Sequence, residues 1–151
     1  LKSPLTFATM REYLINVNER LLSLNQLAHT YMQSRNDTYV MELAIQYIRR
    51  NYPKPITLAM VSNEVSLNYA YFSTMFSKYT GKTFSEYLRN TRMEKAKELL
   101  RQPDISIAEV AAQVGYENYK SFYRAFKDTV GTTPVEYQQK KYRIHRENEK
   151  Q

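Results

Sequence analysis

The feature that most constrains the fold of this 151-residue chain is an internal duplication. Residues 56–88 and 105–138 align with each other along their whole length, with one extra residue in the second copy, beside Glu117. A segment of this length that recurs within a chain corresponds to one supersecondary unit used twice. The matching pairs, first copy before second, are Ala59 and Ala108, Val61 and Val110, Val65 and Val114, Asn68 and Asn118, Phe72 and Phe122, Phe76 and Phe126, and Gly81 and Gly131.

The first helix of each copy begins at a hydroxyl residue. Thr57 and Ser106 precede short apolar-periodic runs, as helix N-caps do, and Ser106 with Glu109 has the spacing of a capping box. Gly115 can adopt the left-handed conformation that a tight helix exit needs, and Ser66 stands at the same place in the first copy. The sequence therefore predicts a helix of about eight residues and a tight turn in each copy.

The second helix of each copy begins at an asparagine N-cap. We expect these helices over about 68–79 and 118–129, each with two buried phenylalanines four residues apart. A glycine ends each helix, and a capping box starts the next one: Gly81 with Thr83 and Glu86, and Gly131 with Thr133, Pro134 and Glu136.

Helix, turn and helix is the pattern of DNA-binding proteins in which the second helix enters the major groove. The alternative is a helical adaptor that binds protein, but arrays of helical hairpins usually need three or more repeats. The formal net charge of +7 favours an anionic partner such as double-stranded DNA, although a basic surface also keeps a protein soluble. The salt dependence of binding distinguishes a DNA-binding domain from a protein-binding adaptor, because a DNA-binding domain loses affinity steeply as the salt concentration rises.

The repeat pair, its spacing and the connecting run RMEKAKELL at residues 92–100 resemble the DNA-binding domain of the AraC/XylS family of bacterial transcription regulators. The resemblance implies an all-α fold with two tandem helix-turn-helix subdomains, over residues 37–83 and 104–142, joined by a linker helix. It also implies transcription activation as the commoner outcome, with RNA polymerase as a further partner. Ser66 departs from the family, which usually has glycine in this turn. The base-contacting positions of the family fall at Ala70, Ser73, Thr74, Tyr119, Lys120 and Arg124.

The second copy turns a basic and aromatic face outward. Since its phenylalanines face the core, helical periodicity exposes Tyr119, Lys120, Tyr123, Arg124 and Lys127. Arg124 is the strongest candidate for base contact, because its rigid guanidinium fork matches the O6 and N7 acceptors of guanine. All cations between residues 104 and 137 belong to this helix, although acidic residues outnumber them there. A general solubilising role does not explain that placement.

The equivalent face of the first copy carries small residues and a tyrosine: Tyr69, Ala70, Ser73 and Thr74. Such residues contact thymine methyl groups or read base edges through water, with less discrimination than an arginine. Two interpretations are open, a preference for A·T-rich sequence or docking by shape.

The segment between the copies, residues 84–103, is the expected linker helix. From Phe84 to Gln102 it would measure about 28 Å at about 1.5 Å per residue, compared with roughly 34 Å for one turn of B-DNA. Two helices at that separation would enter successive major grooves, at an asymmetric site. Its cations are expected to bind phosphates or to pair with Glu94 and Glu98 at i, i+4 spacing: Arg89, Arg92, Lys95, Lys97 and Arg101.

Residues 1–36 precede the repeats and are expected to form an amphipathic, coiled-coil-like helix. Its apolar residues alternate three and four apart: Phe7, Met10, Leu14, Val17, Leu21, Leu24, Ala28 and Tyr31. Two interpretations are open. Residues 7–31 of two copies form a homodimer stalk below a preceding sensor or receiver domain, or the helix docks on its own chain or on that domain. A helix between Tyr39 and Tyr52, ending before Pro53, is expected to complete the first core, and residues 143–151 are expected to form a polar tail.

Several function classes are disfavoured. The chain has no cysteine, and neither His29 nor His145 has a neighbouring cysteine or second histidine in the sequence. No phosphate-binding loop, dinucleotide fingerprint or nucleophile elbow occurs. We therefore expect no catalytic residue, no metal, no cofactor and no enzymatic activity. Because no run of about eighteen apolar residues occurs, no membrane contact is expected within this chain, and the expected location is cytoplasmic.

Overall fold

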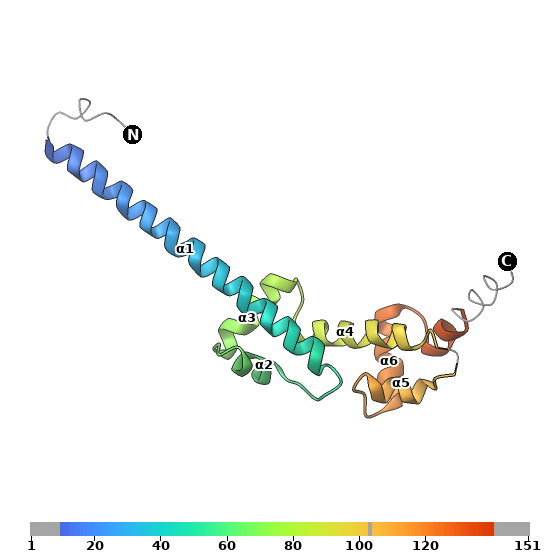
Figure 1. Ribbon diagram of the computed structural model, residues 1–151. Helices are drawn as coiled ribbons and strands as arrows, with labels where there is room; N and C mark the ends of the chain where they lie inside the picture. Colours follow the sequence, from blue (N-terminus) through green and yellow to red (C-terminus); the bar gives the residue numbers. More distant parts are fainter. Residues whose placement is uncertain (1–9, 103, 141–151) are drawn as a thin grey trace. The chain divides into compact units, whose positions relative to one another are not determined.

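Helices make up all the regular structure in the part of the chain that the structure describes. The computed structural model describes residues 10–102 and 104–140 (Figure 1). The all-α expectation is therefore confirmed. The expected polar tail, His145 and Phe7 lie outside the described residues. The helices in chain order are α1 (Met10–Asn51), α2 (Leu58–Glu64), α3 (Tyr69–Thr80), α4 (Phe84–Leu99), α5 (Ile107–Gln113) and α6 (Tyr119–Val130), and residues 134–140 are also helical.

The helix expected between Tyr39 and Tyr52 is present, but it continues directly from the helix before it, because α1 runs without interruption from Met10 to Asn51. No glycine or proline occurs within these 42 residues, so nothing forces a break. At the expected boundary, Gln33 Nε2 donates a hydrogen bond to Asp37 Oδ1 at 3.2 Å, one turn later in the helix. By its contacts the chain divides into two units, residues 1–40 and 41–151, and each is described by itself.

The first unit presents many apolar side chains to solvent. Met10 is 72% exposed, and other members of the expected seam are more than half exposed: Leu14, Leu21 and Leu24. Ile15, Leu22 and Leu27 are equally exposed and lie off the seam, so the apolar surface is wider than a narrow coiled-coil stripe. The dimer stalk therefore stays a prediction. Among the described residues, no helix combines the length and the apolarity that crossing a bilayer requires.

The second unit contains two cores that repeat the same aromatic arrangement. In the first, the rings of Phe72 and Phe76 lie 5.5 Å apart, and Tyr87 meets Phe76 edge-on at 5.4 Å. The equivalent distances in the second core are 5.7 Å for Phe122 and Phe126, and 5.7 Å for Phe126 and Tyr137. Met41, Ala44 and Ile48, at the end of α1, are fully buried in this unit, as are the residues of the second core: Met93, Ala96, Leu100, Val110, Ala111, Val114, Phe122 and Phe126.

The predicted helix ends are confirmed residue by residue. Thr57 and Ser106 accept hydrogen bonds at the starts of α2 and α5, and Ser106 with Glu109 forms the expected capping box. Asn68 and Asn118 cap α3 and α6. The remaining predicted signals also hold: left-handed C-caps at Gly81 and Gly131, and reciprocal hydrogen bonds between Thr83 and Glu86 and between Thr133 and Glu136.

The two helix-turn-helix turns use the same backbone conformation with different residues. Gly115 has a φ of +87° and Ser66 has a φ of +55°. Both values lie in the left-handed region, which costs a residue with a Cβ about 1–2 kcal/mol. The turn therefore has the expected geometry in the first copy despite the missing glycine.

The linker helix is shorter than expected. Helix α4 has 16 residues and ends at Leu99, three residues before Gln102, so it measures about 24 Å at about 1.5 Å per residue. After Leu99 the chain tightens, with Arg101 N donating to the Glu98 carbonyl and Gln102 N to the Leu99 carbonyl. The sequence agrees with an end before Gln102, because the proline at position 103 disfavours the helical conformation of that residue.

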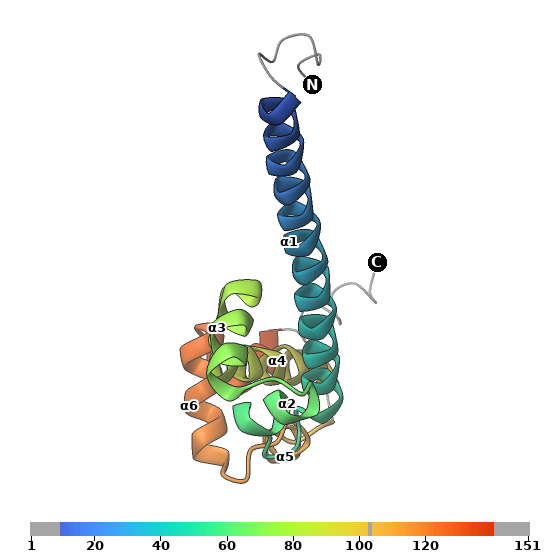
Figure 2. The same cartoon turned by 90° about the vertical axis from the view of Figure 1, so that its left-hand side faces the viewer.

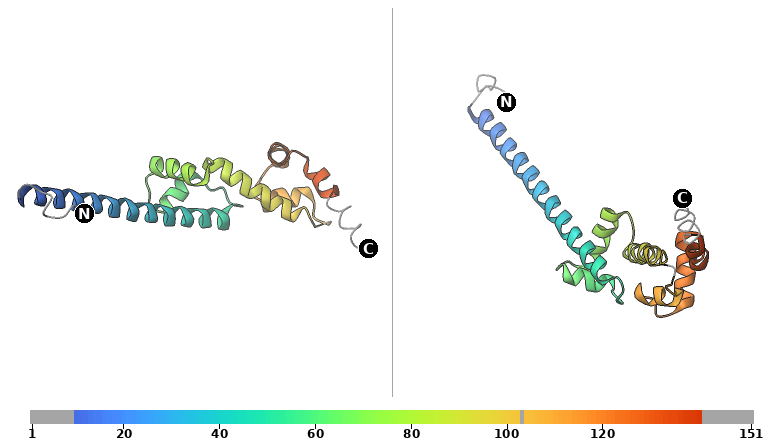
Figure 3. Two further views of the ribbon diagram at one scale, coloured as in Figure 1. Left: turned by 90° about the horizontal axis from the view of Figure 1, so that it is seen from above. Right: turned by 45° about the vertical axis from the view of Figure 1, so that its right-hand side comes forward.

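Helices α3 and α6 lie on the same side of α4. Figure 2 shows both of them beyond one flank of α4, and the view from above in Figure 3 agrees. The linker thus holds two helix-turn-helix units whose second helices share one face of this unit.

Candidate DNA interface

Helix α3 buries one face and presents small polar groups on the other. Its N-cap Asn68 accepts hydrogen bonds from the backbone of Ala70 at 2.9 Å and Tyr71 at 3.4 Å, which fixes the first turn. The Thr74 hydroxyl donates to the Ala70 carbonyl at 3.1 Å, so its oxygen keeps lone pairs for an outside donor. Of the residues expected to face DNA, Tyr69 is 56% exposed, Ala70 and Thr74 are exposed, and Ser73 is half-buried.

Helix α6 has the same kind of N-cap and the same buried face as α3, but different exposed side chains. Asn118 caps it by accepting from Lys120 N at 2.8 Å. Lys120, Arg124 and Lys127 are exposed, as the sequence predicted. Tyr119 is 43% exposed and its ring lies 6.0 Å from that of Tyr123, which is half-buried. The two tyrosines therefore form a paired aromatic surface beside the cations.

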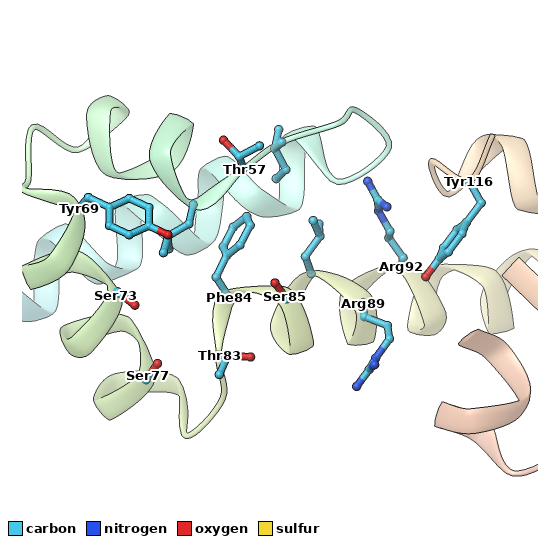
Figure 4. Close-up of a pocket in the computed structure, with 13 residues that line it drawn as sticks. Thr57, Tyr69, Ser73, Ser77, Thr83, Phe84, Ser85, Arg89, Arg92 and Tyr116 are labelled. Atoms are coloured by element: carbon cyan, nitrogen blue, oxygen red, sulfur yellow. The ribbon is translucent and has the colours of Figure 1, made fainter. Parts of the chain in front are cut away.

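An open pocket of about 540 Å³ lies between α3 and α4 (Figure 4). Hydroxyl groups from both helices line it, together with two arginines of α4. Its polar lining includes Tyr69, Ser73, Ser77, Ser85, Arg89, Arg92 and Tyr116. Hydroxyls and guanidinium groups are the side chains that proteins use to hold phosphate oxygens.

A second open pocket, of about 350 Å³, lies against α6. It is lined by Arg89 of α4 and by residues of α6: Lys120, Ser121, Arg124, Ala125 and Asp128. Three cations face one carboxylate there, so the pocket has a net positive charge. Arg89 lines both pockets and is therefore the residue that the α3 and α6 surfaces have in common.

The linker cations divide by what they contact. Lys95 pairs with Glu98 at 2.8 Å, and Lys97 pairs with Glu94 at 2.7 Å. These are i, i+3 pairs, one residue closer than the i, i+4 spacing that we expected. Both pairs are largely exposed and add little stability.

Arg92 neither pairs with a glutamate nor faces outward for a phosphate. Its Nε donates to the Tyr52 carbonyl at 2.8 Å and an Nη to the Lys54 carbonyl at 2.9 Å. The guanidinium carbon lies 5.4 Å from the centre of the Tyr116 ring, a cation–π distance. Burial lowers the pKa of Arg92 and raises that of Tyr116. Arg92 thus joins the loop after α1 to the turn of the second helix-turn-helix.

The same two segments meet again at Gly115. A Cβ added to this glycine would lie 2.5 Å from the Pro53 carbonyl oxygen and 2.8 Å from its carbon. Only glycine therefore allows the second turn to approach the loop so closely. We call Arg92, Tyr116, Gly115 and the loop at residues 52–54 the inter-subdomain brace.

Sequence reasoning missed the brace and the central position of Arg89. Arg92 bonds to carbonyl groups 40 and 38 positions earlier in the chain, and no local pattern encodes such a contact. Gly115 offered a partial signal as a glycine in a turn, but its contact with Pro53 depends on tertiary packing.

Known proteins share this arrangement. A family model described as a helix-turn-helix domain matches residues 61–140, just over half of the chain. The regulatory protein PocR of Salmonella typhimurium is 35% identical over 99 residues, which cover 66% of this chain and 33% of PocR. The chain spans less than half of the length of three curated relatives that it matches.

Solved structures give the same result. The C-terminal domain of AraT, a response regulator from Geobacillus stearothermophilus, is 33% identical with a TM-score of 0.65 and covers 67% of this chain and 84% of that chain. The DNA-binding domain of AdpA, a global transcriptional factor solved in complex with a target DNA, has a TM-score of 0.65 at 21% identity, covering 70% and 95% of the two chains. At that identity the likeness shows the fold alone. From the matched family model and these relatives, the chain belongs to the AraC/XylS family of helix-turn-helix transcription regulators.

Proposed function

We propose that this sequence-specific DNA-binding domain of a transcription regulator inserts α3 and α6 into successive major grooves of one duplex. The observation that carries the proposal is that α3 and α6 lie on the same side of α4, with their phenylalanine faces turned into the cores. Their outward faces are then left for the base edges. The AdpA domain, which shares this fold, was solved in complex with a target DNA, and this supports duplex DNA as the partner.

Helix α6 supplies the stronger base discrimination. Arg124 contacts a guanine through its guanidinium fork, and Lys120 binds a neighbouring guanine or a phosphate. Tyr119 and Tyr123 contact thymine methyl groups or donate to phosphates, while Lys127 serves the backbone. The exposure of the three cations supports these roles.

Helix α3 contributes weaker discrimination through Tyr69, Ala70, Ser73 and Thr74. Small side chains let the helix backbone approach the bases closely and favour contacts with thymine methyl groups. We therefore propose an A·T-rich preference in the half of the site that α3 occupies, and an asymmetric site overall.

The test is selection of bound sequences from a random duplex pool, with the wild-type chain and with Arg124→Ala. The variant should lose discrimination at one position in one half of the site, by about 1–3 kcal/mol, and keep the other half. Uniform weakening across all sequences would reassign Arg124 to a phosphate. A footprint over a single groove would contradict the two-groove arrangement, and binding without salt dependence would favour a protein-binding adaptor.

We also propose that residues 7–31 mediate a homodimer. The exposed leucines of the first unit, above all Leu14, Leu21 and Leu24, are too numerous to be typical of a monomer surface. Sedimentation of the chain with and without residues 1–36 tests this. Dimers that persist after the deletion, or monomers before it, would contradict it.

The wider setting follows from the family. The chain is one part of a longer regulator, with a sensor or receiver domain before it, as the greater length of the relatives and the C-terminal position of the AraT domain suggest. It acts in the bacterial cytoplasm, contacts RNA polymerase when it activates transcription, and catalyses no reaction.

A further inference from the structure

Arg89 occupies a central position between the two recognition helices. It is an exposed residue of α4 and lines both the pocket against α3 and the pocket against α6. Figure 4 shows its side chain extending from α4 in the opposite direction to that of Arg92, away from the loop that Arg92 holds. Ser85, one helical turn earlier, is also exposed and lines the first pocket.

Local partners do not account for Arg89. Within the described ranges it has no hydrogen bond or ion pair, whereas Lys95, Lys97 and Arg92 are all engaged. The neighbouring carboxylate of Glu86 accepts from the backbone and the hydroxyl of Thr83, at 2.9 and 2.7 Å, in the capping box. The Arg89 guanidinium therefore keeps its donors for an outside acceptor.

The geometry of DNA identifies that acceptor. Two successive major grooves on one face of a duplex are separated by a minor groove with a phosphate backbone along each edge. If α3 and α6 enter the major grooves, α4 lies across the minor groove between them, and Arg89 lies over its edges. A guanidinium fork binds two phosphate oxygens at once, and a serine hydroxyl adds a further donor.

We propose that Arg89, with Ser85 beside it, is a third DNA contact, which binds the phosphates bordering the minor groove between the two recognition helices. This contact rests on the two-groove arrangement proposed above. It fixes the register of the domain on the duplex and reads no base. Asp128 is the one carboxylate that lines either of the two pockets, and the two cations of α6 beside it leave this surface positive.

The test is a salt titration of duplex binding by the full chain and by Arg89→Ala. Loss of one charge-assisted phosphate contact should weaken binding about tenfold, and by the same factor for every sequence. The slope of log affinity against log salt should fall in magnitude by about 1. Arg89→Lys keeps the charge and should restore most of the slope. Because Arg89 is exposed, its variants should unfold at the wild-type temperature.

Arg101→Ala is the matched control, since Arg101 is exposed, follows α4 and lines neither pocket. It removes the same charge and should change affinity and slope much less. Equal effects of the two variants would overturn the proposal, as would a loss confined to particular spacer sequences, which would mean base contact in the minor groove. If the wild-type chain shows no salt-dependent duplex binding, the proposed function itself is wrong. If the wild-type chain binds and Arg89→Ala binds equally well, only the Arg89 contact is wrong.

Discussion

Helices α3 and α6 begin, pack and end in the same way, and they differ in what faces outward. Both start at an asparagine cap, bury two phenylalanines and stop at a left-handed glycine. The phenylalanine rings lie 5.5 Å apart in one and 5.7 Å apart in the other. On the outside, α3 has Ala70, Ser73 and Thr74 at the positions where α6 has Lys120, Tyr123 and Arg124. The caps and the buried phenylalanines fix the position of each helix in its core. The exposed residues do not contribute to that packing and can therefore differ between the two helices.

The largest expected effect concerns the turn of the second copy. Gly115→Ala should destabilise the domain by about 3 kcal/mol, because it adds both left-handed strain and a collision with the Pro53 carbonyl. Gly131→Ala is the matched control, since its φ is +82° but nothing lies within 4 Å of an added Cβ. It should cost only about 1 kcal/mol. Equal losses in urea unfolding would show that the contact with Pro53 is unimportant.

A reciprocal exchange tests whether the exposed faces alone decide what is read. Thr74 and Arg124 occupy equivalent positions and both are exposed. Thr74→Arg should add a guanine preference in the α3 half of the site, and Arg124→Thr should remove one in the α6 half, each by about 2 kcal/mol of discrimination. Sequence selection measures both. If Thr74→Arg merely tightened binding to every duplex, the two helices would not approach the bases alike.

Ser66→Gly should make the first turn resemble the second. It removes left-handed strain at a φ of +55°, and the gain is partly offset by the greater freedom of glycine in the unfolded chain. We expect a net stabilisation of about 0.5 kcal/mol in urea unfolding. Ser66→Ala keeps the Cβ and should bring no gain. A similar gain from alanine would locate the effect in the hydroxyl group and not in the backbone.

The smallest effect distinguishes the starts of α2 and α5. Hydrogen bonds from the Ser106 side chain and backbone lower the pKa of Glu109 below its ordinary 4.5. Because the folded pKa is the lower one, this capping contribution is complete above about pH 4.5 and is lost as the pH falls through the folded value. Helix α2 has Met60 at the equivalent position and no such dependence.

Cα chemical shifts at the two helix starts, followed from about pH 5 to about pH 3, measure this difference. Helix α5 should fray at its first turn under acid and α2 should not. Met60→Glu should give α2 the same acid sensitivity, since Thr57 is already its N-cap and Met60 is 46% exposed. Equal behaviour of the two wild-type helices would contradict the role of Glu109.

Local sequence signals were sufficient to predict most of the helix ends and buried faces of the fold. Capping residues and left-handed glycines act within four residues of the chain, so Ser106, Asn118 and Gly131 could be assigned from the sequence. The phenylalanine spacing likewise predicts the buried faces. The same reasoning failed where local preference is weak. No residue between 10 and 51 ends the helix near residue 36, where we expected a boundary, so α1 is continuous. The linker helix ends at Leu99 and not at Gln102.

The candidate interface was only partly predictable. Periodicity placed Arg124 and Lys120 outward, because an amphipathic helix has one free face. It could not rank the linker cations, since the role of each depends on segments distant in the chain. Arg92 turned toward the carbonyl groups of residues 52 and 54, while Arg89 stayed exposed between the two pockets. Only the folded chain distinguishes a structural arginine from one available to a ligand.

The inter-subdomain brace has a consequence for the distance between the two halves of the binding site. Arg92 and the close approach of Gly115 to Pro53 hold the second helix-turn-helix against the loop that precedes the first. One base pair inserted between the half-sites moves the second groove by about 3.4 Å and turns it by about 35° around the duplex axis. Two helix-turn-helix units that the inter-subdomain brace holds together cannot follow that rotation. We therefore expect affinity to depend on the number of base pairs between the two half-sites, and duplexes lengthened one base pair at a time measure how strong this dependence is.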